Sequence, residues 1–334
     1  MQRIDVHCHA LPPGYRQYAL ESGQERPDGM PALPTWTPEQ HISLMERLHI
    51  DKSILSISSP GTCLGPNHDE EDAAHKTRQT NEELSEICKE HPSHFAFFAS
   101  LPLPYVEGSV AEIDYALDVL GAVGLVVLSN ANGVYLGDGA LDPIFEKLNA
   151  LRAVLFIHPT TCQLLGDDGR VRPATPLPSY PRPMMEFMFD ETRAVANLLL
   201  SSTVARYPDL TFIMSHCGCT LPSLLDRIGG FAAIMGSGAE SQGDKFRRLL
   251  RERFYFDLAG FPFPDQLYGL LRVLGEGGEQ RLVYGTDYPF TPENVAIALT
   301  YQLEKGLNEL FDEQERHVVY SGNVQRLFSF PGKS

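Results

Sequence analysis

Short apolar runs recur along the chain and predict buried strands. Several are continuous stretches of Val, Ile, Leu and Phe rather than alternations of apolar and polar residues, which is typical of parallel strands covered on both faces. The predicted strands are Ile4–Val6, Ser53–Ile57, Phe95–Leu101, Val123–Leu128, Val154–Ile157, Leu210–Met214, Phe254–Leu258 and Leu282–Tyr284.

Segments with helical periodicity separate these runs. In Pro38–Leu48, for example, Ile42, Met45 and Leu48 fall on one stripe, and Pro38 suits a first helical turn. Strands that alternate with helices in this way predict an α/β fold, a single (β/α)8 TIM-type barrel domain over residues 1–334. An open, doubly wound sheet is the alternative. The other predicted helices are Glu70–Glu90, Glu186–Arg206, Pro292–Gly306 and Asp312–Leu327.

Two irregular segments interrupt the pattern. Leu11–Thr37 follows the first strand, and the proline-rich Gly166–Pro183 follows the fifth. Loops of this length are uncommon unless they are functional. Because both would leave the same end of a barrel, where active sites are built, we expect them to form lids or pocket walls. Surface insertions without a role are the alternative.

Charge and composition exclude several classes of function. Acidic residues number 43 against 27 basic ones, the formal net charge is −16, and no basic run stands out, which argues against nucleic acid or an anionic membrane surface as a partner. No stretch of apolar residues is long enough for a transmembrane helix, and the N-terminus lacks the apolar core of a signal peptide. The six cysteines have no framework spacing, so we expect reduced thiols in a cytosolic protein.

The first strand carries a candidate metal-binding pair in Asp5-Val6-His7-Cys8-His9. Side chains alternate along a strand, so His7 and His9 share a face and Cys8 points away. Two imidazoles on one side of a strand can hold a single metal ion. The pattern is weak by itself, since two histidines at a strand end can also be incidental.

Three further polar residues each follow a predicted strand. His158 ends the fifth, His216 comes just after the sixth, and Asp287 comes just after the eighth. Singly, each is as well explained by a core histidine with a backbone partner or by an Asp that caps a helix. Together with the first strand, however, they bring histidines and a carboxylate to the mouth of one barrel.

This convergence predicts a metal site. His7, His9, His158 and Asp287 would supply three nitrogen ligands and one oxygen ligand, which suits Zn²⁺ or a similar divalent ion with a position left for water or substrate. His216 would remain beside the metal as an acid, a base or a donor to a bound oxygen. The fourth strand ends in Ser129-Asn130, with no residue to bridge two metals, so we expect one ion.

With these residues the chain resembles the amidohydrolase superfamily. The branch it resembles contains α-amino-β-carboxymuconate-ε-semialdehyde decarboxylase and the hydroxybenzoate decarboxylases. Within that branch it is most similar to the fungal 6-methylsalicylate decarboxylases. The resemblance covers nearly the whole chain. The motifs that carry it are Asp5-Val6-His7-Cys8-His9, Phe97-Phe98-Ala99-Ser100-Leu101-Pro102, Leu141-Asp142-Pro143-Ile144-Phe145, Ile157-His158-Pro159, Ser215-His216-Cys217-Gly218 and Tyr284-Gly285-Thr286-Asp287-Tyr288-Pro289.

The resemblance implies a barrel with one Zn²⁺ or Mn²⁺ ion and loss of CO2 without an organic cofactor. It assigns the metal to the four ligands named above and a catalytic role to His216. It also implies that Phe290 packs on a substrate ring. It further implies that Arg227 reaches the substrate of a neighbouring subunit, which requires a homodimer or a dimer-based oligomer.

Three positions depart from the family pattern. Dihydroxybenzoate decarboxylases usually have Glu in place of His7 and often have an acidic residue in place of Cys219, which counts against 2,3- and 2,6-dihydroxybenzoate as substrates. The semialdehyde decarboxylase has an arginine on its first helix that binds a carboxylate, where this chain has His41. A monocarboxylate substrate is therefore expected rather than a dicarboxylate. Trp36, the single tryptophan, either lines the pocket or anchors the first long loop.

These observations favour a metal-dependent, non-oxidative decarboxylase of a hydroxylated aromatic acid, with conversion of 6-methylsalicylate to m-cresol as the first hypothesis. Asp287 is the candidate proton donor to the ring carbon, and His216 would orient the oxygens at the metal. A hydrolase or hydratase that attacks a small carboxylate or lactone with a metal-activated water is the alternative. A metal-containing binding protein without activity is the second alternative.

Overall fold

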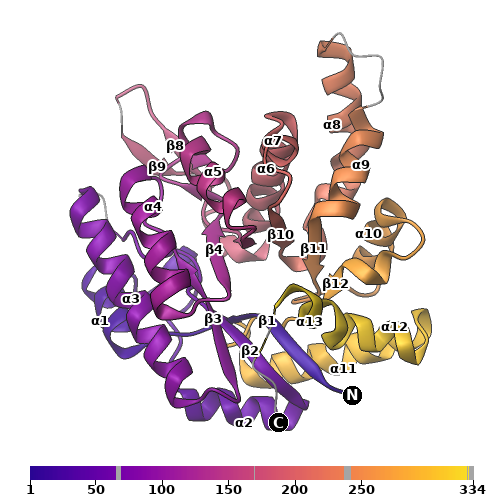
Figure 1. The fold of residues 1–334 in the computed structure, drawn as a ribbon, viewed down its shortest axis with the longest axis horizontal. Coiled ribbons are helices and arrows are strands. Elements are labelled where there is room, and N and C mark those ends of the chain that lie inside the picture. Colours follow the sequence, from indigo (N-terminus) through magenta and orange to yellow (C-terminus); the bar gives the residue numbers. More distant parts are fainter. Residues whose placement is uncertain (65–68, 169, 237–241, 329, 331–334) are drawn as a thin grey trace.

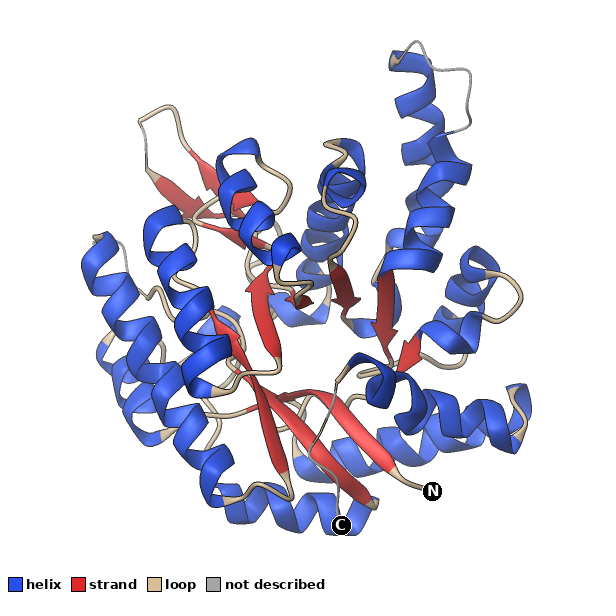
Figure 2. Cartoon of the chain, viewed as in Figure 1, coloured by secondary structure: helices blue, strands red, loops and turns tan. Residues whose placement is uncertain are grey.

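The computed structural model describes residues 1–64, 69–168, 170–236, 242–328 and 330. At its centre lie eight strands that pair in parallel in the order β1-β2-β3-β4-β7-β10-β11-β12, with helices around them (Figures 1 and 2). The strands are β1 (Arg3–His9), β2 (Ile50–Ser56), β3 (Phe95–Ser100), β4 (Gly124–Leu128), β7 (Val154–His158), β10 (Thr211–Met214), β11 (Phe254–Asp257) and β12 (Leu282–Val283).

The sheet closes on itself. The backbone N–H of Val6 donates to the carbonyl of Tyr284 over 3.0 Å, and that of Thr286 donates to the carbonyl of His7 over 3.1 Å. These bonds join the segment after β12 to β1, so the first and last strands are neighbours. The predicted (β/α)8 barrel is confirmed, and the alternative of an open, doubly wound sheet is wrong.

Two apolar clusters explain why these runs become strands. One fills the barrel interior with residues such as Val6, Phe156 and Ile213, and the larger one packs between the strands and the surrounding helices. In β1 the pairing register with β2 shifts between Asp5 and Cys8, which marks a bulge. Simple alternation along β1 therefore breaks there, although His7 and His9 still share a side.

The predicted helix over Pro38–Leu48 forms as α2 with the same bounds. Thr37 caps it by accepting from the backbone N–H of Gln40, and Pro38 occupies the first turn. Its buried side consists of His41, Leu44, Met45 and Leu48. The predicted helix Glu70–Glu90 likewise forms as α3, and Pro292–Gly306 forms as α11 (Glu293–Leu310).

Two predicted helices are interrupted in the structure. The stretch Glu186–Arg206 forms α6 (Glu186–Leu200) and a separate short α7 (Thr203–Arg206), because Ser202 adopts left-handed backbone with φ 62°. The stretch Asp312–Leu327 divides into α12 (Glu313–His317), a π-helical turn (Val318–Gly322) and α13 (Asn323–Leu327). Helices that the hydrophobic pattern missed are α4 (Val106–Asp114), α5 (Asp142–Ala150), α8 (Leu221–Met235), α9 (Gln242–Arg253) and α10 (Gln266–Leu274).

The two long connections are more ordered than the sequence predicted. Leu11–Thr37 contains α1 (Pro13–Glu21) and a 3-10 turn over Pro27–Gly29. The second connection contains a hairpin of β8 (Gln163–Leu165) and β9 (Val171–Pro173) and a 3-10 turn over Arg182–Met184. Proline fixes φ and so suits the start of a helical turn: Pro13 begins α1, Pro27 begins the first 3-10 turn, and Pro183 is the second residue of the other. Proline-rich sequence here therefore does not mean irregular chain.

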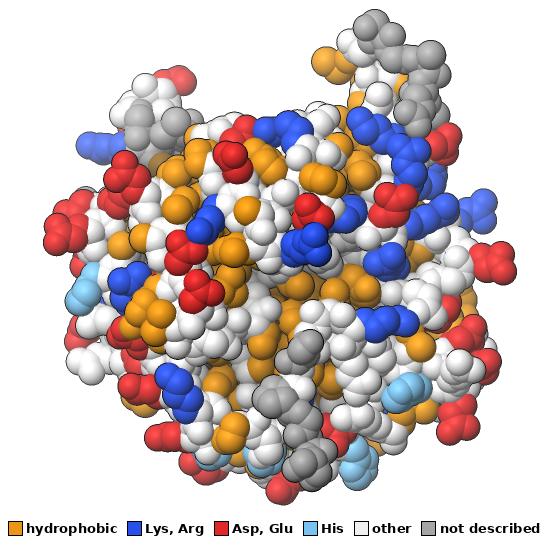
Figure 3. All heavy atoms as spheres, viewed as in Figure 1, with side chains coloured by type: hydrophobic (Ala, Val, Ile, Leu, Met, Phe, Trp, Pro, Cys, Tyr) orange, Lys and Arg blue, Asp and Glu red, His pale blue; other side chains and the backbone are white. Residues whose placement is uncertain are grey.

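Acidic and basic side chains are both present on the face shown in Figure 3. The basic ones include several on α9, a concentration that the sequence analysis did not single out. Arg251 and Arg253 of α9 donate to the backbone carbonyls of Val273 on α10 and of Leu210, which directly precedes β10, so they tie this helix to its neighbours. Within the described residues, no helix combines the length and apolarity needed to cross a membrane.

Candidate metal centre

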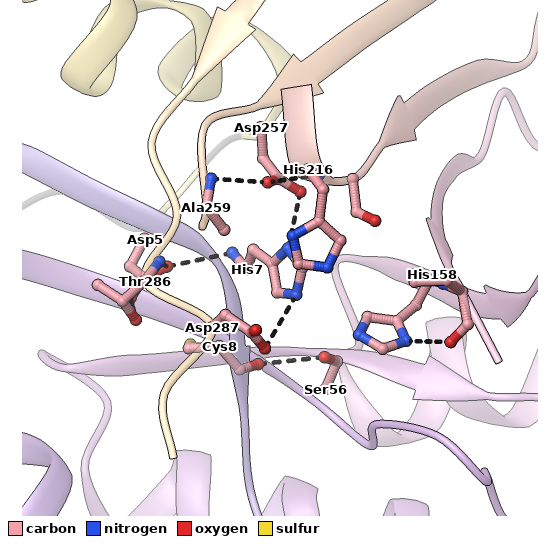
Figure 4. A network of polar contacts seen from close by, with 12 residues as sticks. Asp5, His7, Cys8, Ser56, His158, His216, Asp257, Ala259, Thr286 and Asp287 are labelled. Carbon is pink, nitrogen blue, oxygen red and sulfur yellow. Dashed lines mark hydrogen bonds and ion pairs between the residues drawn. The ribbon is translucent and has the colours of Figure 1, made fainter. Parts of the chain in front are cut away.

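Four side chains meet at the carboxyl ends of the strands. His7 and His9 come from β1, His158 is the last residue of β7, and Asp287 lies in the loop after β12. One ligand atom from each lies within 4.8 Å of the others. Asp287 Oδ1 is 3.4 Å from His7 Nε2 (Figure 4) and 3.2 Å from His9 Nε2. The structure thus brings together the four residues that the sequence predicted as ligands.

Hydrogen bonds fix which nitrogen of each ring faces the cluster. His158 Nδ1 lies 2.7 Å from the carbonyl of Pro159, which can only accept, so Nδ1 carries the proton. The Ser56 hydroxyl donates to the carbonyl of Cys8 over 3.1 Å and therefore accepts from His9 Nδ1, 3.0 Å away. Both rings consequently direct an Nε2 lone pair toward the cluster.

His7 follows the same rule through a carboxylate. Its Nδ1 lies 2.9 Å from Oδ2 of Asp257, the last residue of β11, and both side chains are fully buried. The Nε2 atoms of His7 and His9 have no hydrogen-bond partner among the described residues. Buried lone pairs without a donor are costly unless a cation fills the space between them, so the donor set fits a divalent metal ion.

The charges of the cluster lead to the same conclusion. Burial lowers the pKa of His9 and brings that of His158 well below its ordinary value. Burial opposes ionisation of Asp287, but the neighbouring imidazoles of His7 and His9 outweigh burial and hold its pKa well below the usual range. Burial also opposes a charge on His7, yet the neighbouring Asp257 and Asp287 raise its pKa well above the ordinary value. The cluster therefore attracts positive charge, which a proton or a metal ion can supply.

His216 lies beside these ligands. Its ring centroid is 4.8 Å from that of His7 and 6.3 Å from that of His158, and burial lowers its pKa, which favours the neutral imidazole. Its backbone N–H donates to Asp257 Oδ1 over 3.1 Å. The residue thus stands where the sequence predicted it, next to the ligand set and on the wall of a pocket.

That pocket has a volume of about 630 Å³ and opens above the ligands. Phe187, Met188 and Phe290 contribute to its apolar wall, and the ring of Phe290 lies 5.6 Å from that of His9. Among the described residues that line it there is no Lys or Arg, and the acidic ones are Asp28 and Asp287. The pocket therefore suits an apolar ring and offers no counter-charge to an anionic group remote from the metal ligands.

Both long connections contribute to the pocket, as expected for walls or lids. The first supplies Asp28 and Met30, and the second supplies Pro181, Pro183 and Met184. Asp28 accepts a hydrogen bond from the hydroxyl of Thr161, which ties the first connection to the end of β7. Neither connection is an insertion without contact to the site.

A second cluster of potential ligands consists of Asp5, Cys8 and His41. The indole N–H of Trp36 donates to His41 Nδ1 over 3.0 Å, and because an indole can only donate, the ring proton is on Nε2. His41 therefore presents a hydrogen rather than a lone pair to Cys8 and Asp5. Asp5 in turn accepts from the Thr286 hydroxyl over 2.6 Å. This cluster does not fit a metal ion.

His41 lies outside the pocket. The sequence comparison placed it where a related enzyme has a carboxylate-binding arginine, but His41 is buried on α2 against the rings of Trp36, Phe95 and Tyr288 and does not line the pocket. Burial lowers its pKa to about 3, so it stays neutral. Trp36 anchors the first connection to α2, and of its two proposed roles this is the one that the structure supports.

Arg227 is not part of this pocket within one chain. It lies on α8, with its guanidinium 4.8 Å from the ring centre of Phe231, and lines a separate groove with Leu200 and Met235. Sequence reasoning missed Ser56, a polar residue that ends β2. That position is the signal that could have found Ser56.

Comparisons with known proteins give relatives of similar length. The chain is 34% identical over 335 residues to Decarboxylase macB of Penicillium terrestre, covering 98% of this chain and 95% of that protein. It is 32% identical over 334 residues to the 6-methylsalicylic acid decarboxylase of Penicillium expansum, covering 98% and 96%.

Solved structures match the fold over almost the whole chain. An amidohydrolase II structure has a TM-score of 0.84 at 28% identity and covers 97% of this chain and 99% of its own. A dihydroxybenzoic acid decarboxylase from Polaromonas sp. JS666, with bound manganese and the inhibitor 2-nitroresorcinol, has a TM-score of 0.75 at 22% identity, covering 98% and 96%. The family model described as amidohydrolase matches residues 4–330, and the chain belongs to the amidohydrolase family.

Proposed function

We propose that this protein is a metal-dependent carboxy-lyase that removes CO2, without oxidation, from a hydroxylated aromatic monocarboxylic acid. The observation that carries the proposal is the set of inward-facing imidazole lone pairs and one carboxylate at the base of an apolar pocket that has no Lys or Arg in its described lining. A ring fits such walls, and a second carboxylate would lack a partner. The names of the relatives support the reaction, and 6-methylsalicylate is the first substrate to test.

His7, His9, His158 and Asp287 would hold one divalent ion. Three nitrogen donors and one oxygen donor suit Zn²⁺ best, and manganese in a structural neighbour makes Mn²⁺ the second choice. When bound, the ion would supply a Lewis acid that withdraws charge from the carboxylate and phenolic oxygens of the substrate. Asp257 and Ser56 keep His7 and His9 in the tautomers that this requires.

Asp287 and His216 would handle the proton. The low pKa of Asp287 means that it is ionised before substrate binds, so it can accept the phenolic proton of the substrate. Returning that proton to the ring carbon that bears the carboxylate allows the C–C bond to break, with CO2 leaving and its bonding electrons restoring the aromatic ring. Neutral His216 would donate to the developing charge on the substrate oxygens, and Phe290 would pack on the ring and exclude water.

Assembly forms a second part of the proposal. Figure 1 shows α8 and α9 extending away from the barrel, and α8 exposes Phe231, Ile234 and Met235 to 51%, 80% and 85%. Apolar exposure of this kind suits burial against a second copy of the chain, and Arg227 on the same helix would then reach the partner's pocket. Light scattering should give a homodimer, and a fully active monomer would refute the role of Arg227.

The direct test is CO2 release from a panel of salicylates by protein whose metal content has been measured. We expect stoichiometric CO2 and the corresponding phenol, m-cresol in the case of 6-methylsalicylate, with no added cofactor. Conversion that consumes water without CO2 release would instead identify a hydrolase or hydratase. Absence of turnover with every acid in the panel would leave a binding protein as the explanation.

A further inference from the structure

The turn that carries His216 has an unusual backbone. His216, Cys217, Gly218 and Cys219 have φ values of 48°, 55°, 76° and 54°. Only Gly218 adopts a positive φ at no steric cost, whereas the three other residues are held in a region that L-amino acids avoid. A run of this kind does not persist from local preference, so contacts from elsewhere in the fold must hold it.

Two buried carboxylates hold the start of the turn and its thiol. Asp257 accepts from the N–H of His216 over 3.1 Å. Glu191 of α6 accepts from the N–H of Ser215 over 2.7 Å, from the Ser215 hydroxyl over 2.5 Å and from the thiol of Cys219 over 3.1 Å. These contacts use donors of the turn. Its carbonyl groups are reached from the other side, apart from one bond within the turn in which the N–H of Cys219 donates to the carbonyl of His216 over 2.9 Å.

Gln266, the first residue of α10, provides that other side. Its Nε2 donates to the carbonyl of His216 over 2.7 Å and to the carbonyl of Cys219 over 3.2 Å, which are the first and last residues of the turn. Carbonyl oxygens only accept, so the orientation of this amide is fixed and both of its hydrogens are used. One side chain therefore closes the turn from end to end at the wall of the pocket.

We propose that Gln266 is the positioning residue for His216. By clamping the two carbonyls, it keeps the turn left-handed and the imidazole directed toward the ligand cluster. The proposal rests on the decarboxylase function proposed above, in which His216 stabilises charge on the substrate. Glu191 and Asp257 are completely buried, and Asp257 also contacts His7, so their replacement would mix several effects. Gln266 makes no hydrogen bond to a candidate ligand, so its effect on His216 can be measured separately.

The first experiment compares Gln266→Leu and Gln266→Glu with wild type. Leu removes both donors, whereas Glu keeps the shape and directs an acceptor at two carbonyls. We expect both variants to lower kcat by about 10- to 100-fold, with Glu at least as damaging, while KM stays within about twofold and metal content is unchanged. A Gln266→Glu variant with wild-type kcat would show that only the shape of residue 266 matters and would overturn the proposal. Gln325→Leu on α13 is the matched control, because among the described residues this side chain bonds to Gln2 alone.

The second experiment asks whether Gln266 acts through His216. In the His216→Ala background, Gln266→Leu should cause no further loss of kcat, because there is no imidazole left to position. A loss that multiplies with that of His216→Ala would contradict the proposal.

Crystal structures of wild type and Gln266→Leu provide a readout that does not depend on turnover. We expect the carbonyls of His216 and Cys219 to turn away and the imidazole to shift or to occupy alternative positions. An unmoved turn would refute the proposal whatever the activity. If wild type releases no CO2 from any acid, the proposed function fails, and this structural comparison still decides whether Gln266 holds the turn.

Discussion

Two clusters of potential metal ligands flank β1, and comparing them shows what makes a metal site. His7 and His9 meet His158 and Asp287 at the mouth of the barrel, while Asp5 and Cys8 meet His41 from α2. Both clusters combine imidazole with a carboxylate, and every ligand in both is buried except Asp287, whose side chain is 20% exposed. Residue type and burial therefore do not distinguish them.

The two clusters differ in the hydrogen-bond partner of the histidine Nδ1 atom. At the mouth, acceptors on Asp257, Ser56 and Pro159 receive hydrogen bonds from the Nδ1–H groups, so the Nε2 lone pairs face inward. On the other side, the indole of Trp36 donates to His41 Nδ1 and places the remaining proton toward Asp5 and Cys8. A cation is attracted to the first arrangement and repelled by the second, because the first presents lone pairs and the second a hydrogen.

The largest expected effect is on metal content. Wild type should hold one divalent ion per chain, and His158→Ala should hold almost none and lose all activity. His41→Phe, which fills a site already surrounded by aromatic rings, should keep the ion. Elemental analysis measures all three, and circular dichroism should show that the barrel still folds in each. Two ions per chain in wild type, or full occupancy in His158→Ala, would break the distinction between the clusters.

The next effect separates metal binding from chemistry within the mouth cluster. His216→Ala should keep the ion, because the four ligands are unchanged. It should lose about 10²- to 10⁴-fold in rate, because a positioned proton-handling group is gone. Asp287→Asn should retain part of the metal, but its rate of decarboxylation should fall to background, since an amide cannot carry the proton. Metal analysis and CO2 release from 6-methylsalicylate check both variants. If His216→Ala lost the metal and Asp287→Asn kept both metal and rate, the two roles would have to be exchanged.

A smaller effect tests the tautomer argument directly. Ser56→Ala removes the acceptor for His9 Nδ1, so His9 is no longer held with its Nε2 lone pair inward, and metal affinity should fall about 10- to 100-fold. Ser53→Ala, another buried serine of β2 whose hydroxyl has no hydrogen-bond partner among the described residues, is the matched control and should bind metal normally. Competition with a chromophoric chelator measures both affinities, and equal values would refute the argument.

The smallest effect concerns stability and His41. Burial depresses its pKa from 6.5 to about 3, so below pH 6.5 the unfolded chain takes up a proton that the folded chain does not. Stability is therefore lost as the pH falls from 6.5 toward 3, by up to about 1.4 kcal/mol per pH unit from this residue. Urea unfolding measures the free energy of unfolding at pH 7 and at pH 5. The decrease between these pH values should be about 2 kcal/mol smaller in His41→Phe than in wild type. Equal losses in the two proteins would mean that His41 is protonated in the fold.

Much of the architecture was accessible from the sequence because it depends on short segments. Several barrel strands are continuous apolar runs, and His9, His158 and Asp287 stand at or just after the end of a strand, where the fold brings all strand ends together. Strand and helix ends were less accurate. Helix breaks such as the one at Ser202 depend on single backbone angles that the hydrophobic pattern does not report.

The burial of His41 had a local signal in the sequence. His41 has the same helical spacing as Leu44, Met45 and Leu48, the residues that form the buried side of α2, and this spacing indicates burial. What it touches there could not be read from α2, because Phe95 and Tyr288 come from distant segments.

The sequence by itself determined the residue types, their order and the apolar runs that form the barrel, and with them which four side chains meet at its mouth. Only the tertiary structure decided the protonation pattern that distinguishes a metal site from a cluster of similar residues. His7 and Asp257 are 250 residues apart, and His9 and Ser56 are 47 apart. Whether a ring nitrogen carries a proton depends on whether the atom beside it is a hydrogen-bond acceptor or a donor, and only the folded chain brings that atom there.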